Sequence, residues 1–428
     1  MCEFIVKQFD FKEAVNECLR GFYSNSFFHI YVDGDFNPIV SKIPSQKDKG
    51  TALHEYTHYF QNIGTLWGLY SSIQNYEVII EFKKALVASK EIKRPFAFSL
   101  PEALERKNEY LKHGNGTMGY LGWKLDTKSS IDIEFKEVLI NGRDQKQVNV
   151  SFTLNDGSIQ TVQLGAHIIK ESMAALYQSL LDPLAGHDDV PYNLVRLIAE
   201  KHFPETAKDI RKLICCCHTS LFSMSPGSCL IDVLREAEYF QPQKNGFELF
   251  SKFLYSKEIT TGKGEKKTIM TFFNDMVDGF KKMLGYNLVA DLDYIDAVLE
   301  RVRLNGKYYP FLSVLYEGDG IFSEDDFTEL IGYYGIPYIQ TSMYGIHHPQ
   351  GRSDEGKEGS LDVLELIVQE ALYSSFVEQK HTYCCPLYYM CQGSPYEKPE
   401  CFGNPWEGGL CSYRIVSDSL GLDKKRVE

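Results

Sequence analysis

The sequence of 428 residues has little that would place it in a membrane or on nucleic acid. No segment approaches the ~18 uninterrupted apolar residues that a membrane-spanning helix needs. The first apolar stretch contains Glu3 and Lys7, which is not typical of a signal peptide. The net charge of −13 argues against the clustered Lys and Arg that bind phosphate groups. We therefore expect a cytoplasmic protein without membrane or nucleic-acid partners.

The 11 cysteines lack the pattern of a secreted disulfide framework, because their number is odd and three of them are consecutive. This supports a reducing compartment. Residues 215–217, the consecutive cysteines, lie in an apolar stretch, which favours packing in the core over metal binding. Four cysteines near the end of the chain could bind a structural zinc: Cys385, Cys391, Cys401 and Cys411. Their spacings are wider than in zinc ribbons, so packing against tyrosines is the default interpretation.

Composition and periodicity predict a folded α+β protein that is mainly helical. Hydrophobic residues make up 43% of the chain and charged residues 24%, as is ordinary for globular proteins. Apolar residues at helical spacing predict helices at 9–22, 51–90, 101–113, 164–181, 190–240, 267–335 and 362–379. Alternation of apolar and polar residues predicts strands at 27–32, 39–40, 131–140, 148–154, 159–164 and 338–341. Ser225 is expected to cap a helix, and residues 260–268 are expected to form a solvated turn.

A motif for metal chemistry lies in the helix predicted after residue 50, where His54-Glu55-x-x-His58 has the spacing H-E-x-x-H. Positions four apart lie on one face of a helix about one turn apart, so two imidazoles can bind one metal ion. Zinc prefers N and S donors in a tetrahedron and needs a further protein ligand. Glu55 lies beside the pair, where a carboxylate can take the proton of a water activated by the metal. The pattern predicts zinc ligands at His54 and His58 and a general base at Glu55.

A different interpretation is a core helix whose histidines only make hydrogen bonds. Chance produces this spacing in roughly one such chain in fifty, so the pattern alone is only suggestive. Leu53, Phe60 and Ile63 give the stretch a buried character. Buried histidines and a buried glutamate without a metal would each need a polar partner. Metal binding is therefore the simpler interpretation.

The helix predicted at 164–181 carries Glu171 in its middle, flanked by the small residues Ser172 and Ala174. With H-E-x-x-H on an earlier helix, the chain resembles the gluzincins, zinc metallopeptidases of the thermolysin-like type. In that group a glutamate on a later helix, often followed by a small residue and then alanine, is the third metal ligand. The resemblance implies that Zn²⁺ is bound by His54, His58 and Glu171, with Glu55 as the general base. It covers only these two helices.

The resemblance implies a zincin-like core with a small N-terminal mixed sheet, an active-site helix, inserted antiparallel strands and a helical C-terminal half. We expect the metal-binding half at residues 1–185, a helical half at 186–380 and a Cys-rich tail packed on the body at 381–428. Many gluzincins have an acidic residue four positions after the ligand glutamate, and here Ala175 stands there, so another group must orient the histidine. The metzincin pattern does not fit, because Gln61 and Gly64 replace its glycine and third histidine.

Two assignments stay open. Rivals to Glu171 as the third ligand are His187, Asp188, Asp189, Glu365 and Glu370. A residue that stabilises an oxyanion is also expected near the metal. Candidates for that role are Tyr344, His347 and His348, in the loop-like stretch 343–360, and His218. This stretch is otherwise interpreted as an exposed connector.

The sequence therefore predicts a zinc-dependent metallopeptidase that hydrolyses a peptide or protein substrate. A second hypothesis is a binding or scaffold protein that keeps zinc for structure, and a third is a zinc hydrolase of non-peptide amides. A purely structural site prefers four closed ligands and needs no base, so Glu55 argues against the scaffold. The sequence does not separate peptides from other amides, and it does not predict an oligomeric state.

Overall fold

The structure of the protein is a computed structural model. It describes residues 21–24, 29–32, 46–93, 95–119, 121–126, 129–261, 264–304, 309–317, 321–341, 345–347, 361–378, 411–422 and 426–427.

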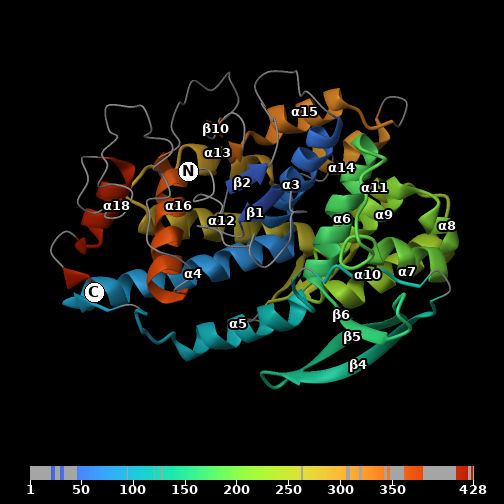
Figure 1. Ribbon diagram of the computed structural model, residues 1–428, viewed down its shortest axis with the longest axis horizontal. Coiled ribbons are helices and arrows are strands. Elements are labelled where there is room, and N and C mark those ends of the chain that lie inside the picture. Colours follow the sequence, from blue (N-terminus) through green and yellow to red (C-terminus); the bar gives the residue numbers. More distant parts are fainter. Residues whose placement is uncertain are drawn as a thin grey trace.

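Helices make up most of this structure (Figure 1). The α-helices are α3 Gln46–Gly64, α4 Leu66–Ala88, α5 Glu102–Asn115, α6 Ala166–Leu181, α7 Leu194–His202, α8 Pro204–Ala207, α9 Ile210–Ser220, α10 Pro226–Arg235, α11 Gly246–Ser256, α12 Ile269–Asn287, α13 Tyr294–Arg301, α14 Pro310–Ser313, α15 Glu324–Tyr334, α16 Leu361–Tyr373 and α18 Ser412–Ser419. Shorter π- or 3₁₀-helical turns are η1 Glu236–Phe240, η2 Val314–Tyr316 and η3 Ser374–Glu378. The prediction of a mainly helical α+β protein is confirmed.

The strands form small sheets. They are β1 Gly21–Ser24, β2 His29–Val32, β3 Glu91–Ile92, β4 Ile131–Ile140, β5 Arg143–Thr153, β6 Ile159–Leu164, β7 Glu258–Thr260, β8 Lys266–Thr268, β9 Tyr338–Thr341, β10 Gly345–His347 and β11 Arg426–Val427. One sheet has the order β1-β2-β9-β10, with β2 and β9 parallel and the outer pairs antiparallel. The antiparallel sheet β4-β5-β6 is the insertion that the sequence predicts before the Glu171 helix.

Helix α3 lies in the interior of the molecule (Figure 1). One of its sides packs in the hydrophobic core, and another carries the two histidines of the motif. One side is core: Leu53 and Phe60 are fully buried, and Phe60 stacks on Phe311 of α14 with ring centroids 3.8 Å apart. A different side carries His54 and His58 toward α6. Because an α-helix repeats every 3.6 residues, positions 54 and 58 share a face that position 60 does not. Packing of the apolar side therefore fixes the direction of the two histidines.

A sharp turn joins α3 to α4. Thr65 caps α4, because its hydroxyl accepts a hydrogen bond from the backbone N–H of Gly68 at 3.0 Å. A Cβ at Gly68 would lie 1.9 Å from the carbonyl oxygen of Gln61, so only glycine fits there. The N–H of Trp67 donates to the carbonyl of Leu221, just after α9, at 2.8 Å. These contacts fix the end of the helix that carries the two histidines.

Some local predictions are wrong. The helix predicted at 9–22 extends too far, because Gly21 and Phe22 pair with β2 as part of β1, while its other residues and the strand at 39–40 lie outside the described residues. Ser225 occupies the position before α10, but its side chain accepts no capping hydrogen bond, and its hydroxyl donates to Gln145 at 3.2 Å. The turn predicted at 260–268 is right in kind but too long, because Thr260 and Lys266–Thr268 belong to the strands β7 and β8 of an exposed hairpin.

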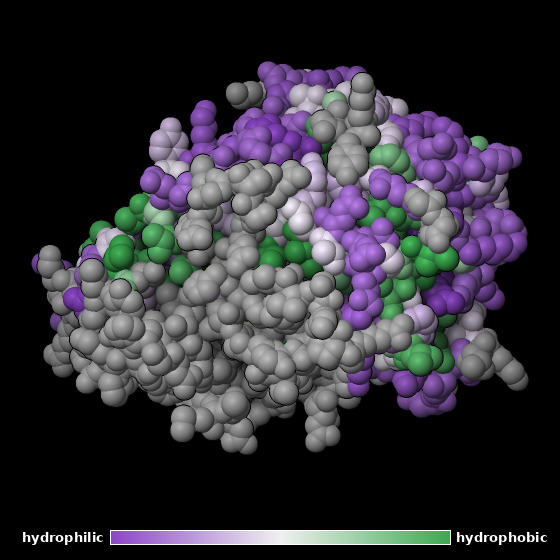
Figure 2. Space-filling model, turned by 90° about the horizontal axis from the view of Figure 1, so that it is seen from above, coloured by the Kyte–Doolittle hydropathy of each residue, from purple (hydrophilic) through white to green (hydrophobic). Residues whose placement is uncertain are grey.

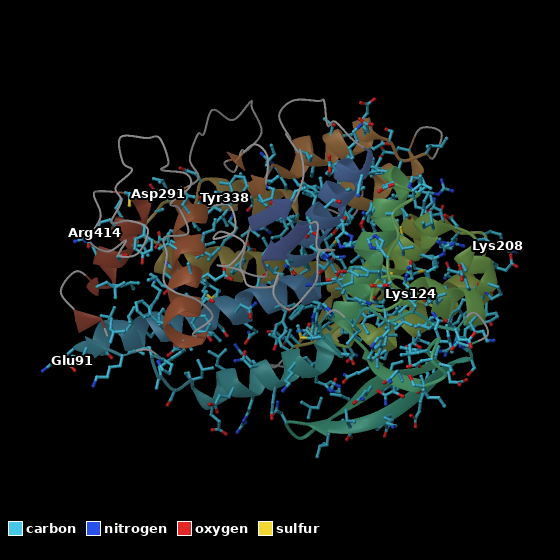
Figure 3. The ribbon with its side chains drawn as sticks, viewed as in Figure 1. Glu91, Lys124, Lys208, Asp291, Tyr338 and Arg414 are labelled. Carbon is cyan, nitrogen blue, oxygen red and sulfur yellow. The ribbon has the colours of Figure 1, made fainter. Side chains whose placement is uncertain are left out.

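Charged groups lie at both ends of the molecule. Glu91 projects at one end and Lys208 at the other (Figure 3). On the face seen from above, hydrophilic side chains cover most of the right-hand side (Figure 2). Of the helices in the described ranges, none is long and apolar enough to span a lipid bilayer.

Candidate metal centre

Helices α3 and α6 pack against each other in opposite directions. Near the start of α3, a Cβ on Gly50 would lie 2.7 Å from the Cβ of Asp182, just after α6. Near the other end of α3, the amide of Gln61 donates to the carbonyl of Lys170 at 3.0 Å, close to the start of α6. Gly50 has no side chain and Ala174 of α6 is fully buried. The two backbones are therefore so close that side chains of α3 and α6 meet between the helices.

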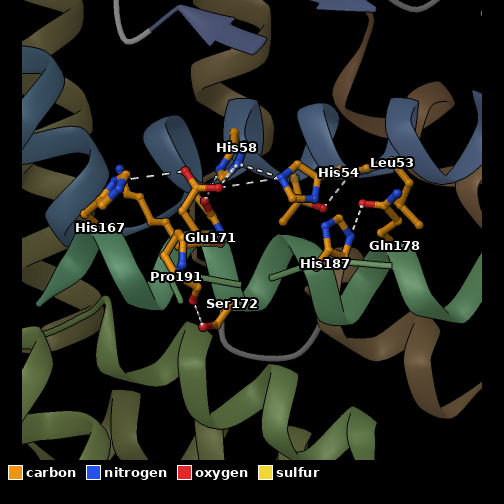
Figure 4. Close-up of polar contacts among 12 residues, drawn as sticks. Leu53, His54, His58, His167, Glu171, Ser172, Gln178, His187 and Pro191 are labelled. Atoms are coloured by element: carbon orange, nitrogen blue, oxygen red, sulfur yellow. Dashed lines mark hydrogen bonds and ion pairs between the residues drawn. The ribbon is translucent and has the colours of Figure 1, made fainter. Parts of the chain in front are cut away.

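Three of these side chains meet at one point (Figure 4). The Nε2 atoms of His54 and His58 are 3.2 Å apart, and they lie 3.7 Å and 3.4 Å from Oε2 of Glu171. In a tetrahedral zinc site with bonds of about 2.0–2.2 Å, two ligand atoms are about 3.3–3.6 Å apart. The three observed separations bracket this range. Within the part of the chain that the structure describes, no other group of three His, Cys, Asp or Glu side chains has comparable geometry.

Gln61 fixes the orientation of His58. Its amide nitrogen donates to the carbonyl of Lys170, so its oxygen faces His58 and accepts from Nδ1 at 2.9 Å. The Nδ1 atom must then carry the proton, which in a neutral imidazole leaves the Nε2 lone pair for a metal. Gln61 thus makes a hydrogen bond to the ring nitrogen of His58 that faces away from the cluster, which the methyl group of Ala175 cannot make.

Without a cation, the three groups compete for protons. Burial lowers the pKa of His58, but attraction to Glu171 outweighs burial and raises it to about 9. Burial would raise the pKa of Glu171, yet the two histidines hold it well below its usual value. The pKa of His54 is lowered by burial and by the neighbouring His58. His58 is therefore an imidazolium at neutral pH, with protons on both ring nitrogens. A cation would have to displace the proton on Nε2.

Glu55 is buried beside this cluster and is 5% exposed. Burial raises its pKa to about 8, and the charge of Glu171 adds to the shift, while His58 opposes it. Its Oε2 has no hydrogen-bond partner among the described residues. A buried carboxylate oxygen without a donor, next to two imidazoles and a second carboxylate, is what a bound cation would satisfy. The donor set of two imidazole nitrogens and one carboxylate oxygen fits zinc.

His187 and Tyr192 line the His54 end of the cluster. The ring of His187 lies 5.8 Å from that of His54 and 4.8 Å from that of Tyr192, measured between centroids. Burial and the proximity of His54 lower the pKa of His187 to about 4, so this histidine is neutral. Its Nε2 lies 2.9 Å from Oε1 of Gln178, which accepts its proton. His187, one of the alternatives to Glu171 as the third ligand, therefore lies near the cluster, but its Nε2 donates to Gln178 and does not face the two histidines.

The four carboxylates considered as rivals to Glu171 lie away from the two histidines. Glu365 is on α16, where its carboxylate accepts from the backbone N–H groups of Val289 and Ala290 at 2.8 and 2.9 Å. Asp189 accepts from the N–H of Leu125 at 2.8 Å. Asp188 lies 3.8 Å from Lys124, and Glu370 is on α16 with Glu365. The structure therefore brings Glu171, and none of these four carboxylates, to His54 and His58.

Of the four residues expected to stabilise an oxyanion, His218 has a described side chain, and it contacts aromatic core residues instead of the cluster. His218 is fully buried in aromatic core, where its Nε2 contacts the hydroxyl of Tyr309 at 2.8 Å and its ring stacks on Phe60. His347 is in β10, opposite Ile339. Tyr344 and His348 lie outside the described residues, as do Cys385, Cys391 and Cys401. Cys411 precedes α18, and its sulfur accepts from the N–H of Arg414.

Sequence reasoning missed His167 and Gln178, which flank Glu171 on α6. The Nδ1 of His167 lies 4.0 Å from Oε1 of Glu171, and its Nε2 accepts from the backbone N–H of Gly119 at 3.2 Å. The signal that could have found them is helical spacing, because position 167 is four residues before Glu171 and position 178 is seven after it. The predicted packing role of the three consecutive cysteines is confirmed, since all three are buried.

Comparison with family models, with curated proteins and with solved structures found no match for this chain.

Proposed function

We propose that the protein is a zinc-dependent peptidase in which His54, His58 and Glu171 hold the metal and Glu55 is the general base. The observation that carries this proposal is the set of three donor atoms at separations of 3.2, 3.4 and 3.7 Å. Three protein ligands leave a fourth position of the tetrahedron open, as in catalytic rather than structural zinc sites. The H-E-x-x-H spacing and a glutamate from a second helix agree with the gluzincin arrangement.

Zinc at this site would supply Lewis-acid chemistry, because it polarises a carbonyl group and makes water acidic near neutral pH. The protein's own part is to hold and move a proton. Burial raises the pKa of Glu55 to about 8. Once a bound cation has displaced the proton of Glu55, the carboxylate would be able to accept a proton from water and pass it to a leaving amine. Gln61 keeps the Nε2 lone pair of His58 directed at the cluster.

A peptide is the proposed substrate because a short sheet lies against the metal helix. Strands β1 and β2 pack on α3, and β1 ends the order β1-β2-β9-β10 among the described strands. The outer backbone groups of such a strand can pair with an extended peptide. A peptide bound in this way would run beside the helix that carries His54 and His58.

Metal analysis and peptide hydrolysis of the wild type and four variants test the proposal. We expect about one zinc per chain in the wild type and in Glu55→Gln, and loss of zinc in His58→Ala and Glu171→Ala. Glu55→Gln should lower kcat for a peptide library about 10²- to 10⁴-fold while keeping its zinc, because only the proton acceptor is removed. Glu200→Gln is a matched control, since Glu200 is an exposed glutamate on α7.

The outcomes separate metal binding from chemistry. A wild-type protein purified without chelator that holds no zinc would overturn the metal site. Full activity of Glu55→Gln would leave the metal site standing and refute the role of Glu55. A zinc-loaded wild type that cleaves no peptide or unfolded protein would refute the peptidase and favour a scaffold or an amidase of other substrates.

A further inference from the structure

Strand β4 is a long open edge of the β4-β5-β6 sheet. It pairs with β5 along all ten of its residues, from Ile131 to Ile140. In Figure 1 it lies at the lower margin of the molecule, outside β5 and β6. Within the described residues, no strand pairs with its outer side, and the one contact of its outer backbone is from His202 Nε2 to the carbonyl of Ile131 at 2.7 Å. The edge from residue 132 onward is therefore available.

The turn after β4 shows which backbone groups face outward. Asn141 and Gly142 have φ of 51° and 75°, as in a two-residue hairpin turn closed by the pair Ile140 and Arg143. In an antiparallel ladder, hydrogen-bonded pairs alternate with pairs that are not hydrogen-bonded. Even-numbered residues of β4 therefore bond to β5, while odd-numbered residues point their N–H and C=O groups outward. The contact of His202 with Ile131 agrees with this assignment.

The side chains of this edge combine exposed apolar groups with charges of both signs. Exposed edge strands are usually blunted by charges or proline. Here Phe135 is 47% and Leu139 is 71% exposed, and β4 contains no proline. Its charges are Asp132, Glu134, Lys136 and Glu137, and of these Glu134 and Lys136 are separated by one residue on the same face and form an ion pair. Such a strand is complementary to an inverted copy of itself.

Charge selects one register for that pairing. Two copies of β4 related by a two-fold axis can be centred on any residue from 133 to 137. Centres at 134, 136 and 137 place Glu134, Lys136 or Glu137 opposite itself, and the centre at 133 places Asp132 opposite Glu134. The centre at Phe135 places Glu134 of each copy opposite Lys136 of the other. Like charges directly opposite destabilise a sheet and opposite charges stabilise it. The centre at Glu134 also pairs Asp132 with Lys136 but sets Glu134 against itself, so the centre at Phe135 is the one of these five registers that pairs opposite charges without opposing like charges.

We propose that the protein dimerises by antiparallel pairing of β4 with β4 of a second copy, centred on Phe135. The outward groups of Phe135 would pair with those of Phe135 in the second copy, and those of Ile133 with those of Glu137. Each of these pairs exchanges two hydrogen bonds. Glu134 and Lys136 then fall at positions that are not hydrogen-bonded, where opposite side chains are closest. The two three-stranded sheets become one six-stranded sheet.

Analytical ultracentrifugation of the full chain over a concentration series tests the dimer and its charges. The wild type should dimerise, and Glu134→Lys or Lys136→Glu should each raise the dimer Kd about tenfold or more, because two pairs of like charges then face each other. The double variant should dimerise as the wild type does. An equimolar mixture of the two single variants should also recover the dimer, because each then supplies what the other lacks.

A cysteine pair tests the register directly. Phe135→Cys should form a disulfide-linked dimer on mild oxidation, because residues opposite each other in a hydrogen-bonded pair have Cα atoms about 5.5 Å apart, within disulfide range. Leu139→Cys is the matched control: in the proposed register its two copies are about 26 Å apart, eight residues along the strand, and should not cross-link.

Two results would overturn the proposal. One is a wild type that stays monomeric at every concentration. The other is a dimer whose Kd neither single charge reversal changes and in which Phe135→Cys cross-links no better than Leu139→Cys or the wild type. Glu134 and Lys136 side chains are 61% and 51% exposed, so circular dichroism and thermal unfolding should match the wild type in all variants with changed charge.

Discussion

The proposed metal site depends on a buried amide, Gln61. An acidic residue placed after the ligand glutamate is the usual orienting group in the gluzincins, and here α6 has Ala175 at that position. The amide takes this role because it has both a donor and an acceptor. Its donor is used by Lys170, which leaves its acceptor for His58. A neutral amide orients the imidazole without adding another negative charge beside Glu55 and Glu171.

Gln61→Leu should weaken zinc binding about 10- to 100-fold, as is typical for the loss of an outer hydrogen bond to a metal-binding histidine. The reason is that Nδ1 of His58 would lose its acceptor and the imidazole its fixed orientation. Competition with a fluorescent chelator measures the zinc Kd. Gln74→Leu is a matched control, because Gln74 is a buried glutamine of α4. If both variants bind zinc equally well, Gln61 has no orienting role.

The residues of the candidate site differ in how far the sequence reveals them. His54, Glu55 and His58 follow from helical spacing and Glu171 from the resemblance to the gluzincins, and the structure brings the three proposed ligands together. The role of Gln61 could not be predicted, because it depends on the carbonyl of Lys170, 109 positions away in the sequence. A hydrogen bond between two helices leaves no periodic signal on either of them.

At the scale of elements, the separation of α3 and α6 decides whether the three donor atoms meet. The ligand atoms come from opposite helices, so any increase in the distance between the helices is added to the distances to Glu171. Gly50 has no Cβ, and a Cβ there would lie 2.7 Å from the Cβ of Asp182 and 3.2 Å from Cγ of Gln178. Glycine is otherwise unfavourable inside a helix. Its presence in α3 is explained by this close approach.

Gly50→Ala should lower the free energy of unfolding by about 1–3 kcal/mol, because the added methyl group overpacks the α3–α6 contact. It should also weaken zinc binding by moving α6 away from α3. Gly279→Ala is the matched control: Gly279 lies in α12 with nothing within 4 Å of an added Cβ, so alanine should stabilise the protein by about 0.5–1 kcal/mol. Urea unfolding and zinc titration measure both effects. Stabilisation by Gly50→Ala would contradict the close packing.

The elements themselves were largely predictable, and their long-range pairing was not. Alternation of apolar and polar residues predicts β4, the second half of β5, and β6, and the turn residues predict the hairpin between β5 and β6. The parallel pairing of β2 with β9 joins His29 to Tyr338, more than 300 positions apart, and no local pattern specifies it. β2 forms a hairpin with β1, whose first two residues helical spacing assigns to the end of a helix.

At the scale of the whole molecule, the proposed metal site couples chemistry to folding. His54 and Glu55 are buried and Glu171 is half-buried, and they come from helices that have large apolar contacts on their other sides. Burial of these groups without a cation is costly, because charged and polar atoms lose their water. A ligand that binds only the folded protein adds its binding free energy to stability. Zinc should therefore stabilise the entire fold, and the size of the effect should depend on pH.

The sign of this dependence follows from the two raised pKa values. In the zinc-free protein, His58 with a pKa of about 9 and Glu55 with a pKa of about 8 both carry protons at pH 7. Zinc must displace these protons, about two per ion. Zinc affinity should therefore be highest near pH 9 and fall as the pH decreases toward 6. The stabilisation by zinc should fall with it.

Urea unfolding with and without zinc, from pH 6 to pH 9, measures this coupling. Free zinc at 100 times its Kd should raise the free energy of unfolding by about 2.7 kcal/mol. At a fixed zinc concentration chosen to give that gain at pH 9, the gain should shrink steadily toward pH 6, and calorimetry in buffers of different ionisation enthalpy should detect the released protons. His58→Ala should show neither the gain nor the release. A zinc effect of equal size at every pH would mean that zinc does not displace the protons of His58 and Glu55, and the metal would then have to bind elsewhere.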